Sequence, residues 1–494
     1  MTPLATSTTE PAGQSRGRSR LRRIGRVIVI VLISVLIVLM IEGYLNYRGQ
    51  QRLANAIAEA DRLDPGWRMA DLDSQEPAIP ESENGALLLF DAFRNGNKNG
   101  DWGMRREGYR DQELFSLRPY HRLPPAKAKI LRDAMAAVEP ARIAARKLAE
   151  RPRGRLNLEW RPNPTFPVDS IYDSSAIIRL LNYDARLRTE DGDLEGAMVS
   201  SRAALHISGY LTAATEPGLD ALGCYYFALD GIEHNLAQGQ VGEPTLKDLQ
   251  EILEAANQRP KLLQFWRRDR ANYERWLAQI AEGKTPLSQL PKVSDSPKLS
   301  FFPQWLQDLK DRFSAARRLA RLPAERAARL RYVTRLVEIA KLPIEDQWPA
   351  ILEHNATLKD QPWLTRTLAP HGPRVYMVHC HNLALVRTAM TALAAERFRL
   401  RNDRWPKTLE ELTPDFIARV PHDPFANGPL RLVVLDDGII IYSVGDDRHD
   451  DGGEIVSNLP PGGKLRGLDL GFRLWDADKR GQPAPGAKAE GKKP

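Results

Sequence analysis

An uninterrupted apolar run near the N-terminus constrains this chain more than any other feature. Residues 27–41 read VIVIVLISVLIVLMI, fifteen residues without a charge. A helix over residues 24–44 would cover roughly 30 Å of hydrocarbon, the thickness of a bilayer core, with Arg26 extending its side chain to the interface. The run therefore predicts a single transmembrane helix at residues 24–44.

The residues before the run set its expected orientation. They include Arg16, Arg18, Arg20, Arg22, Arg23 and Arg26, with only Glu10 against them. The positive-inside rule then leaves residues 1–23 in the cytoplasm as a disordered basic tail and places the bulk of the chain outside the cell inner membrane. A cleaved signal peptide is the alternative. No small-residue cleavage pattern follows the run, which is long for a signal, so an uncleaved signal anchor is favoured.

The charge composition bears on which kinds of partner the chain can bind. The 494 residues carry a net charge of +8, but basic and acidic residues are mixed along most of the length and form no long basic face. Together with an extracytoplasmic position, this pattern indicates no nucleic-acid partner. The two cysteines, Cys224 and Cys380, are consistent with one disulfide or with two free buried thiols.

Helical periodicity dominates residues 45–375 and predicts a helical extracytoplasmic domain. Apolar residues at helical spacing extend the first helix outward as far as Pro65, which stops it. A Pro-rich stretch near residues 283–303 interrupts the pattern and predicts a loop or hinge. The expected fold class is therefore mainly α.

One helical hairpin is especially clear. In ARLRTEDGDLEGA, Gly192 ends one predicted helix and Asp193 caps the next. The stretch resembles one tetratricopeptide unit through Ala185, Leu187, Gly192, Leu194 and Ala197. No strict 34-residue period follows, so we expect an irregular helical repeat whose surface holds a protein partner.

The pattern changes in residues 376–475, which predict a small α+β module of a long helix and antiparallel strands. Two strand-like runs, LRLVVLD and GIIIYSVG, are joined by an Asp-Gly turn at Gly438. Residues 476–494 are poor in apolar side chains and predict a disordered tail.

This order of elements resembles the globular part of the type II secretion major pseudopilins. The matching stretches are ERFRLRNDRWPKTLEEL, VPHDPFANGPL and YSVGDDRHDDGG, between about His381 and Val456. The resemblance implies a role in secretion or surface assembly. More than three hundred residues separate the apolar run from the module, and Glu42 follows the run instead of lying near its start. These departures favour a head module reused on a larger anchored protein.

In that family, the loop after the last strand binds calcium. Carried over by position, the candidate ligands are Asp446, Asp447, Asp450, Asp451 and Glu454. Ca²⁺ takes six to eight oxygen ligands, which clustered carboxylates in a glycine-containing loop can supply. The alternatives are a solvated acidic turn with Arg448 and His449 as countercharges, or a transition-metal site using His449.

A second candidate metal cluster is His379, Cys380 and His381. On a helix the two imidazoles would diverge, and no other nearby Cys or His completes a tetrahedral set, so packing is the favoured interpretation. Short catalytic signatures such as G-x-S-x-G, H-E-x-x-H and Walker A are absent. We therefore expect a non-enzymatic scaffold or interaction protein. An envelope hydrolase with an active site between helices is the alternative.

Overall fold

The computed structural model describes residues 14–75, 78–96, 118–155, 168–214, 219–259, 261–291, 304–455 and 468–483. It is mainly helical with one small antiparallel sheet, which confirms the predicted fold class at that level. Two compact units emerge from the packing. Unit 1 comprises residues 1–65, 274–332 and 360–369, and unit 2 comprises residues 66–273, 333–359 and 370–494.

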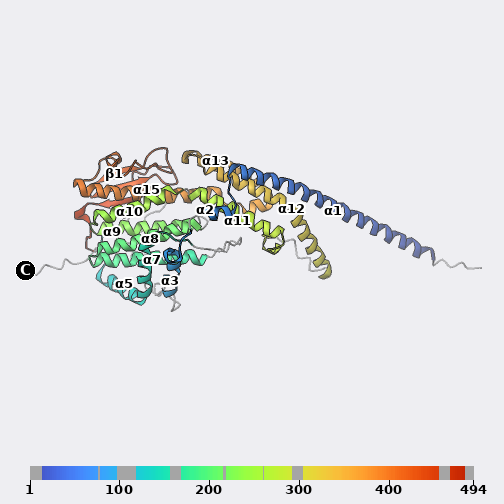
Figure 1. Ribbon diagram of the computed structural model, residues 1–494, viewed down its shortest axis with the longest axis horizontal. Coiled ribbons are helices and arrows are strands. Elements are labelled where there is room, and N and C mark those ends of the chain that lie inside the picture. The colour runs from blue at the N-terminus through green and yellow to red at the C-terminus, as the bar shows by residue number, and fades with distance from the viewer. Residues whose placement is uncertain are drawn as a thin grey trace, which may run out of the picture. The chain divides into compact units, whose positions relative to one another are not determined.

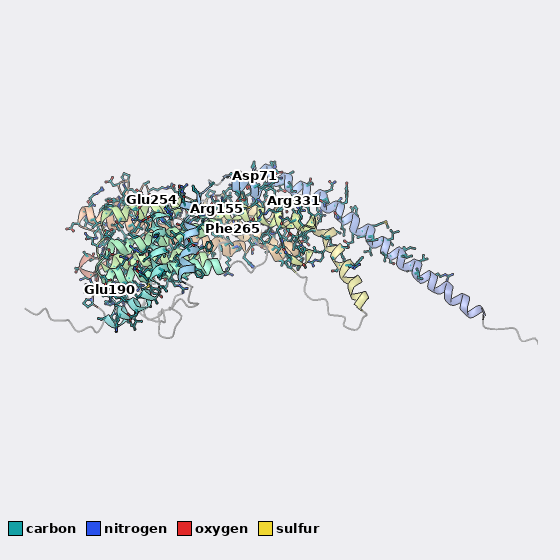
Figure 2. The ribbon with its side chains drawn as sticks, turned by 60° about the horizontal axis from the view of Figure 1, so that its bottom comes forward. Asp71, Arg155, Glu190, Glu254, Phe265 and Arg331 are labelled. Atoms are coloured by element: carbon teal, nitrogen blue, oxygen red, sulfur yellow. The ribbon has the colours of Figure 1, made fainter. Side chains whose placement is uncertain are left out.

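Unit 1 is built on α1 (Gln14–Leu63), the first part of α12 (Gln304–Ile339) and the short α14 (Trp363–Leu368). α1 ends just before Pro65, as expected. It begins at Gln14, so residues 14–23 are helical and the predicted disorder of that part of the tail is wrong; residues 1–13 lie outside the described residues. A Glu59 carboxylate oxygen of α1 lies 3.1 Å from the Arg331 Nε of α12. Figure 2 labels Arg331.

The apolar part of α1 is not covered by any of the residues that the structure describes. Large side chains from Ile28 to Ile41 are about half exposed, for example Leu32 at 61% and Met40 at 58%. Within the described residues, α1 is the one helix long and apolar enough to cross a membrane. Further along, Leu53, Ala56 and Ala60 are buried, so the same helix changes from an exposed to a packed surface.

Unit 2 contains most of the helices and one extended core. Its helices are α2 (Met69–Gln75), α3 (Gly85–Gly96), α5 (Pro125–Ala137), α6 (Glu139–Arg146), α7 (Val168–Glu190), α8 (Leu194–Ala214), α9 (Leu219–Gln238), α10 (Glu243–Gln258), the start of α11 (Lys261–Ala281), α13 (Ile344–Ala356) and α15 (Gly372–Asn402). Figure 1 shows α7, α8, α9, α10 and α15 side by side, with the sheet next to α15. A single cluster of buried apolar side chains runs through these helices and the sheet.

The sheet has the order β1–β2–β3, from β1 (Arg431–Leu435), β2 (Gly438–Ser443) and β3 (Leu470–Trp475). The predicted hairpin is confirmed, with Leu435 opposite Gly438. Gly438 has φ +147°, and a Cβ there would lie 2.0 Å from the Leu474 carbonyl oxygen, so only glycine fits this turn. β3 was not predicted.

The packing continues across residue 376. α15 begins at Gly372 and lies against α9, α10 and two strands, so the C-terminal helix and sheet share the core of the preceding helices. The disordered tail was predicted to begin at residue 476, but the ordered packing extends beyond that residue. Arg480 is buried, and its guanidinium donates to both carboxylate oxygens of Glu396 at 2.8 Å. Residues 484–494 lie outside the described residues.

Candidate functional site

The α7–α8 hairpin forms as predicted. Gly192 has φ +81°, and the Asp193 carboxylate accepts a hydrogen bond from the Gly196 N–H at 2.9 Å, which caps α8. These two residues account for the turn by local chemistry alone. The tetratricopeptide resemblance stays a prediction.

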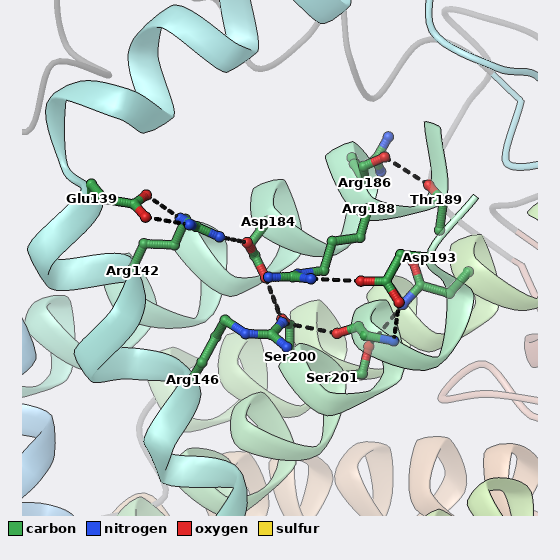
Figure 3. A network of polar contacts seen from close by, with 12 residues as sticks. Glu139, Arg142, Arg146, Asp184, Arg186, Arg188, Thr189, Asp193, Ser200 and Ser201 are labelled. Carbon is green, nitrogen blue, oxygen red and sulfur yellow. Dashed lines mark hydrogen bonds and ion pairs between the residues drawn. The ribbon is translucent and has the colours of Figure 1, made fainter. Parts of the chain in front are cut away.

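A buried carboxylate holds α6 against this hairpin (Figure 3). The Asp184 side chain is 3% exposed and accepts hydrogen bonds from Arg142 at 2.6 Å, Arg146 at 2.7 Å and Ser200 at 2.5 Å. Burial raises the pKa of Asp184, but these hydrogen bonds and the arginine charges outweigh it and hold the pKa below its ordinary value. Arg188 adds a contact at 3.0 Å. The carboxylate is fully engaged, which indicates a structural role.

The five acidic residues predicted to bind calcium lie after β2, and three of them contact protein groups there. Asp450 accepts from the Tyr442 hydroxyl at 3.0 Å and lies 3.2 Å from the Arg431 Nε. Asp451 lies 3.1 Å from the His449 Nδ1. Asp447 accepts from the His449 N–H at 2.9 Å. The remaining two, Asp446 and Glu454, are exposed.

The sequence interpretation missed Asp469, which lies just before β3 and organises this loop. Its carboxylate accepts from the Gly453 N–H at 2.7 Å and from the Asp451 N–H at 3.4 Å. Burial raises the pKa of Asp469, with the neighbouring charges of Asp450 and Asp451 acting in the same direction. One Asp451 oxygen, Oδ2, is buried and has no hydrogen-bond partner among the residues that the structure describes. The loop is thus closed by a carboxylate from a distant position in the sequence.

These side chains do not converge as a metal site would. In the part of the chain that the structure describes, no three His, Cys, Asp or Glu side chains form a group able to hold a metal ion. The donor types suit calcium, but binding through all five predicted ligands would require the loop to rearrange. Calcium stays a prediction.

The His379–Cys380–His381 cluster falls within α15, where successive side chains diverge. His381 packs edge-on against Phe425, with ring centroids 5.4 Å apart. Burial, with added repulsion from Lys261 and Arg387, lowers the pKa of His379 to about 3. Cys380 is a free, buried thiol. The side chain of Cys224 lies outside the described side chains.

The D-P-F and Y-S-x-G stretches are joined by a buried contact. The Asp423 carboxylate, 1% exposed, accepts from the Ser443 hydroxyl at 2.6 Å and from the Val444 N–H at 3.0 Å. It also accepts from the Phe425 N–H at 2.9 Å. The acidic residue of the first stretch therefore fixes the end of β2, which explains why these residue types occur together.

A small cavity of about 110 Å³ lies between α8, α9 and α10. Its polar groups are His206, Tyr225 and Arg259, and most of the remaining lining is apolar. The His206 Nδ1 lies 2.9 Å from the Leu148 carbonyl oxygen, and burial lowers the pKa of this imidazole. Substrate sites are typically about 300 Å³ or larger, so this space suits only a small group.

A row of titratable side chains on α9 was also missed by the sequence interpretation. Asp230, Glu233 and His234 lie within two turns of one helix, and Asp230 is 3.9 Å from the Arg186 guanidinium of α7. Burial raises the pKa of Asp230 despite Arg186, and it lowers the pKa of His234 well below its ordinary value. A carboxyl with a raised pKa, one helical turn from an imidazole with a lowered pKa, is a pairing that general acid–base chemistry uses. The only signal in the sequence is the short segment DGIEH.

Comparison with known proteins supplies no relative. No family model, no curated protein and no solved structure matches this chain.

Proposed function

We propose that this chain is a single-span protein of the bacterial inner membrane whose helical unit binds a protein partner outside the cytoplasm. The observation that carries the proposal is the exposed apolar surface of α1, from Ile28 to Ile41, which no part of the described protein covers. Water disfavours so much apolar area, and a bilayer core accepts it. The arginines before the run favour a cytoplasmic N-terminus.

The sequence resemblances support a role for this chain in protein binding. The α7–α8 hairpin resembles a unit of a protein-binding repeat, and the C-terminal helix and sheet follow the order of a pseudopilin head. We therefore infer a scaffold in secretion or surface assembly, without catalysis of its own. Calcium bound at the acidic loop would stabilise the C-terminal part of unit 2 in that role.

Exposed apolar residues on three helices of unit 2 suggest where the partner binds. Leu87 on α3, Ile130 on α5 and Ile143 on α6 are 44–52% exposed, and α6 packs against both of the other helices. Single exposed apolar residues are common, but three on neighbouring helices offer a contact surface.

In-cell photocrosslinking tests this surface. A photoreactive amino acid at Leu87, Ile130 or Ile143 should give an adduct of one common mass, carrying the same partner protein. Leu352 on α13 is 45% exposed and serves as the matched control. Adducts at Leu352 alone, or different adducts at each position, would contradict the proposed surface.

The α9 row favours the second candidate, an envelope hydrolase. In that case Asp230 would act as general acid and His234 as base, on a substrate entering beside Arg186. Asp230→Asn should then abolish hydrolysis of a peptide, glycoside or phosphoester substrate without loss of folding. Unchanged activity in Asp230→Asn, or no activity in the intact protein on all three classes, would remove this candidate.

A further inference from the structure

A cleft of about 400 Å³ lies in unit 1, beside the end of the apolar part of α1. This volume is in the range of sites that bind small molecules. The cleft is lined by Tyr44, Leu45, Arg48, Arg52, Arg321, Ala324, Glu325 and Pro362.

Two helices that run in the same direction form its walls. Glu42 of α1 pairs with Arg321 of α12 at 3.0 Å, and pairing continues further along both helices. Between these contacts, a Cβ on Gly49 would lie 3.0 Å from the Ala324 backbone nitrogen, so glycine permits the close approach. α12 contains Pro323, and before it the helix diverges from α1 (Figures 1 and 2).

The cleft carries an excess of positive charge. Arg48 and Arg52 are exposed, and neither pairs with a carboxylate among the described residues. Arg321 shares Glu42 with Arg317, each at 3.0 Å. The second carboxylate, Glu325, already accepts from the Leu364 N–H at 3.0 Å. Three arginines and one engaged glutamate therefore line the cleft. The Arg48 guanidinium lies 6.0 Å from the centre of the Tyr44 ring, a contact that leaves its N–H donors, like those of Arg52, available to an anion.

The position of the cleft identifies the anion. The apolar run ends at Ile41, so Arg48 begins roughly 10 Å further along the helix axis, at 1.5 Å per residue. Its long side chain can reach back to the phosphate layer that borders the hydrocarbon. Tyr44 and Tyr47 are 59% and 62% exposed at the level where membrane proteins carry aromatic residues. On the first half of α12, Phe313 is 44% exposed and offers further apolar contact.

We propose that this cleft binds the phosphate headgroup of an anionic phospholipid in the outer leaflet, with Arg48 and Arg52 as hydrogen-bond donors and Arg321, which is paired with Glu42, adding positive charge. Guanidinium groups bind phosphate oxygens through paired N–H donors, and Leu45 and Tyr44 provide the apolar edge that an acyl chain requires. The inference rests on the proposed membrane anchoring of α1.

The test uses the full chain, purified in a neutral detergent and examined by native mass spectrometry. Mixed micelles containing phosphatidylglycerol or phosphatidylcholine are compared, with and without inorganic phosphate. We expect a retained phosphatidylglycerol adduct on the intact protein and at least a tenfold weaker one on Arg48→Gln/Arg52→Gln. Arg62→Gln removes the same type of charge from α1, ten residues beyond Arg52, and should behave as the intact protein does.

Three results would overturn the inference. Equal retention of both lipids would exclude recognition of the anionic headgroup. Displacement of the lipid by inorganic phosphate would assign the same arginines to a soluble phosphate instead. An equal loss of phosphatidylglycerol from the Arg62→Gln control would show that the lipid responds to the net charge of the protein and not to Arg48 and Arg52. Failure of the membrane anchor would appear separately, as protein recovered from cells in the soluble fraction.

Discussion

α1 and α15 are both long helices rich in apolar residues, but their surroundings differ completely. The side chains of α1 from Ile28 to Ile41 are exposed, whereas α15 is buried over most of its length, including Leu393 and Ala394 at 0%. α15 also carries buried charge, since Glu396 is 0% exposed and is paired with Arg480. Apolar side chains are stabilised by leaving water, which the packing of unit 2 achieves for α15 and which the proposed bilayer would achieve for α1.

The largest expected effect follows from placing charge on α1. A charged residue at the centre of a membrane helix costs about 2.5–3.5 kcal/mol on the insertion scale, so Ile33→Asp/Leu36→Asp should remove most of the protein from the membrane fraction. Cell fractionation with alkaline extraction measures this. Ile130→Asp, at an exposed site in unit 2, is the control and should stay in the membrane. An unchanged distribution of the α1 variant would show that this helix is not the anchor.

On α15, the loss of one charge should destabilise the fold and leave the protein in the membrane fraction. Hydrogen bonds from Arg480 and Arg399 offset the burial of Glu396 and hold its pKa below the ordinary value. Glu396→Gln leaves a buried guanidinium without its countercharge, which should lower the free energy of unfolding by about 3 kcal/mol. Denaturant unfolding checks this, with the exposed Glu410→Gln as control, expected within about 0.5 kcal/mol of the intact protein. Equal stability of both variants would exclude a structural role for the pair.

His379 on α15 predicts a pH dependence. Its pKa is about 3 in the folded protein, below the ordinary value of 6.5, so the unfolded chain binds a proton that the folded protein does not. The contribution of this residue to stability should therefore fall as the pH decreases from 6.5 towards 3. His379→Gln should flatten thermal stability over this range, whereas His371→Gln, at the exposed N-terminus of the same helix, should follow the intact protein. The same slope in all three proteins would contradict the lowered pKa of His379.

Calcium should have the smallest effect of these tests, a small shift in the thermal midpoint. We expect excess calcium to raise the thermal midpoint of the intact protein by a few degrees relative to chelator, because ligand binding to the folded state stabilises it. The variant with Asn at Asp446, Asp447, Asp450 and Asp451 should lose the shift. No shift in the intact protein would assign the acidic loop to a solvated turn held by Asp469 and Arg431.

The predictable parts of this fold are those specified by adjacent residues. Pro65 ends α1, Gly192 and Asp193 form the α7–α8 turn, and Gly438 forms the β1–β2 turn, each through chemistry within a few residues. The contacts that were missed join distant positions. Arg480 lies in a polar segment that resembles a loose tail, and its partner is 84 residues earlier.

In the candidate site, too, contacts between distant positions were not predicted. The sequence identified five clustered acidic residues, but not Asp469, which closes their loop from 18 residues beyond Asp451. It also gave no reason to single out Asp230 and His234, because burial in the fold raises the pKa of Asp230 against the effect of Arg186 and, together with Arg186, lowers that of His234. Burial and long-range pairing are properties of the folded chain, and periodicity alone does not specify partners.

The most direct test of the account is the topology of the full chain in a bacterial cell. A phosphatase reporter that is active only outside the cytoplasm is fused after residue 494, and a fluorescent reporter that folds only in the cytoplasm is fused in its place in a second strain. We expect phosphatase activity, no fluorescence, and a membrane-bound product of uncleaved mass. Fluorescence without phosphatase activity, or a shortened soluble product, would contradict it.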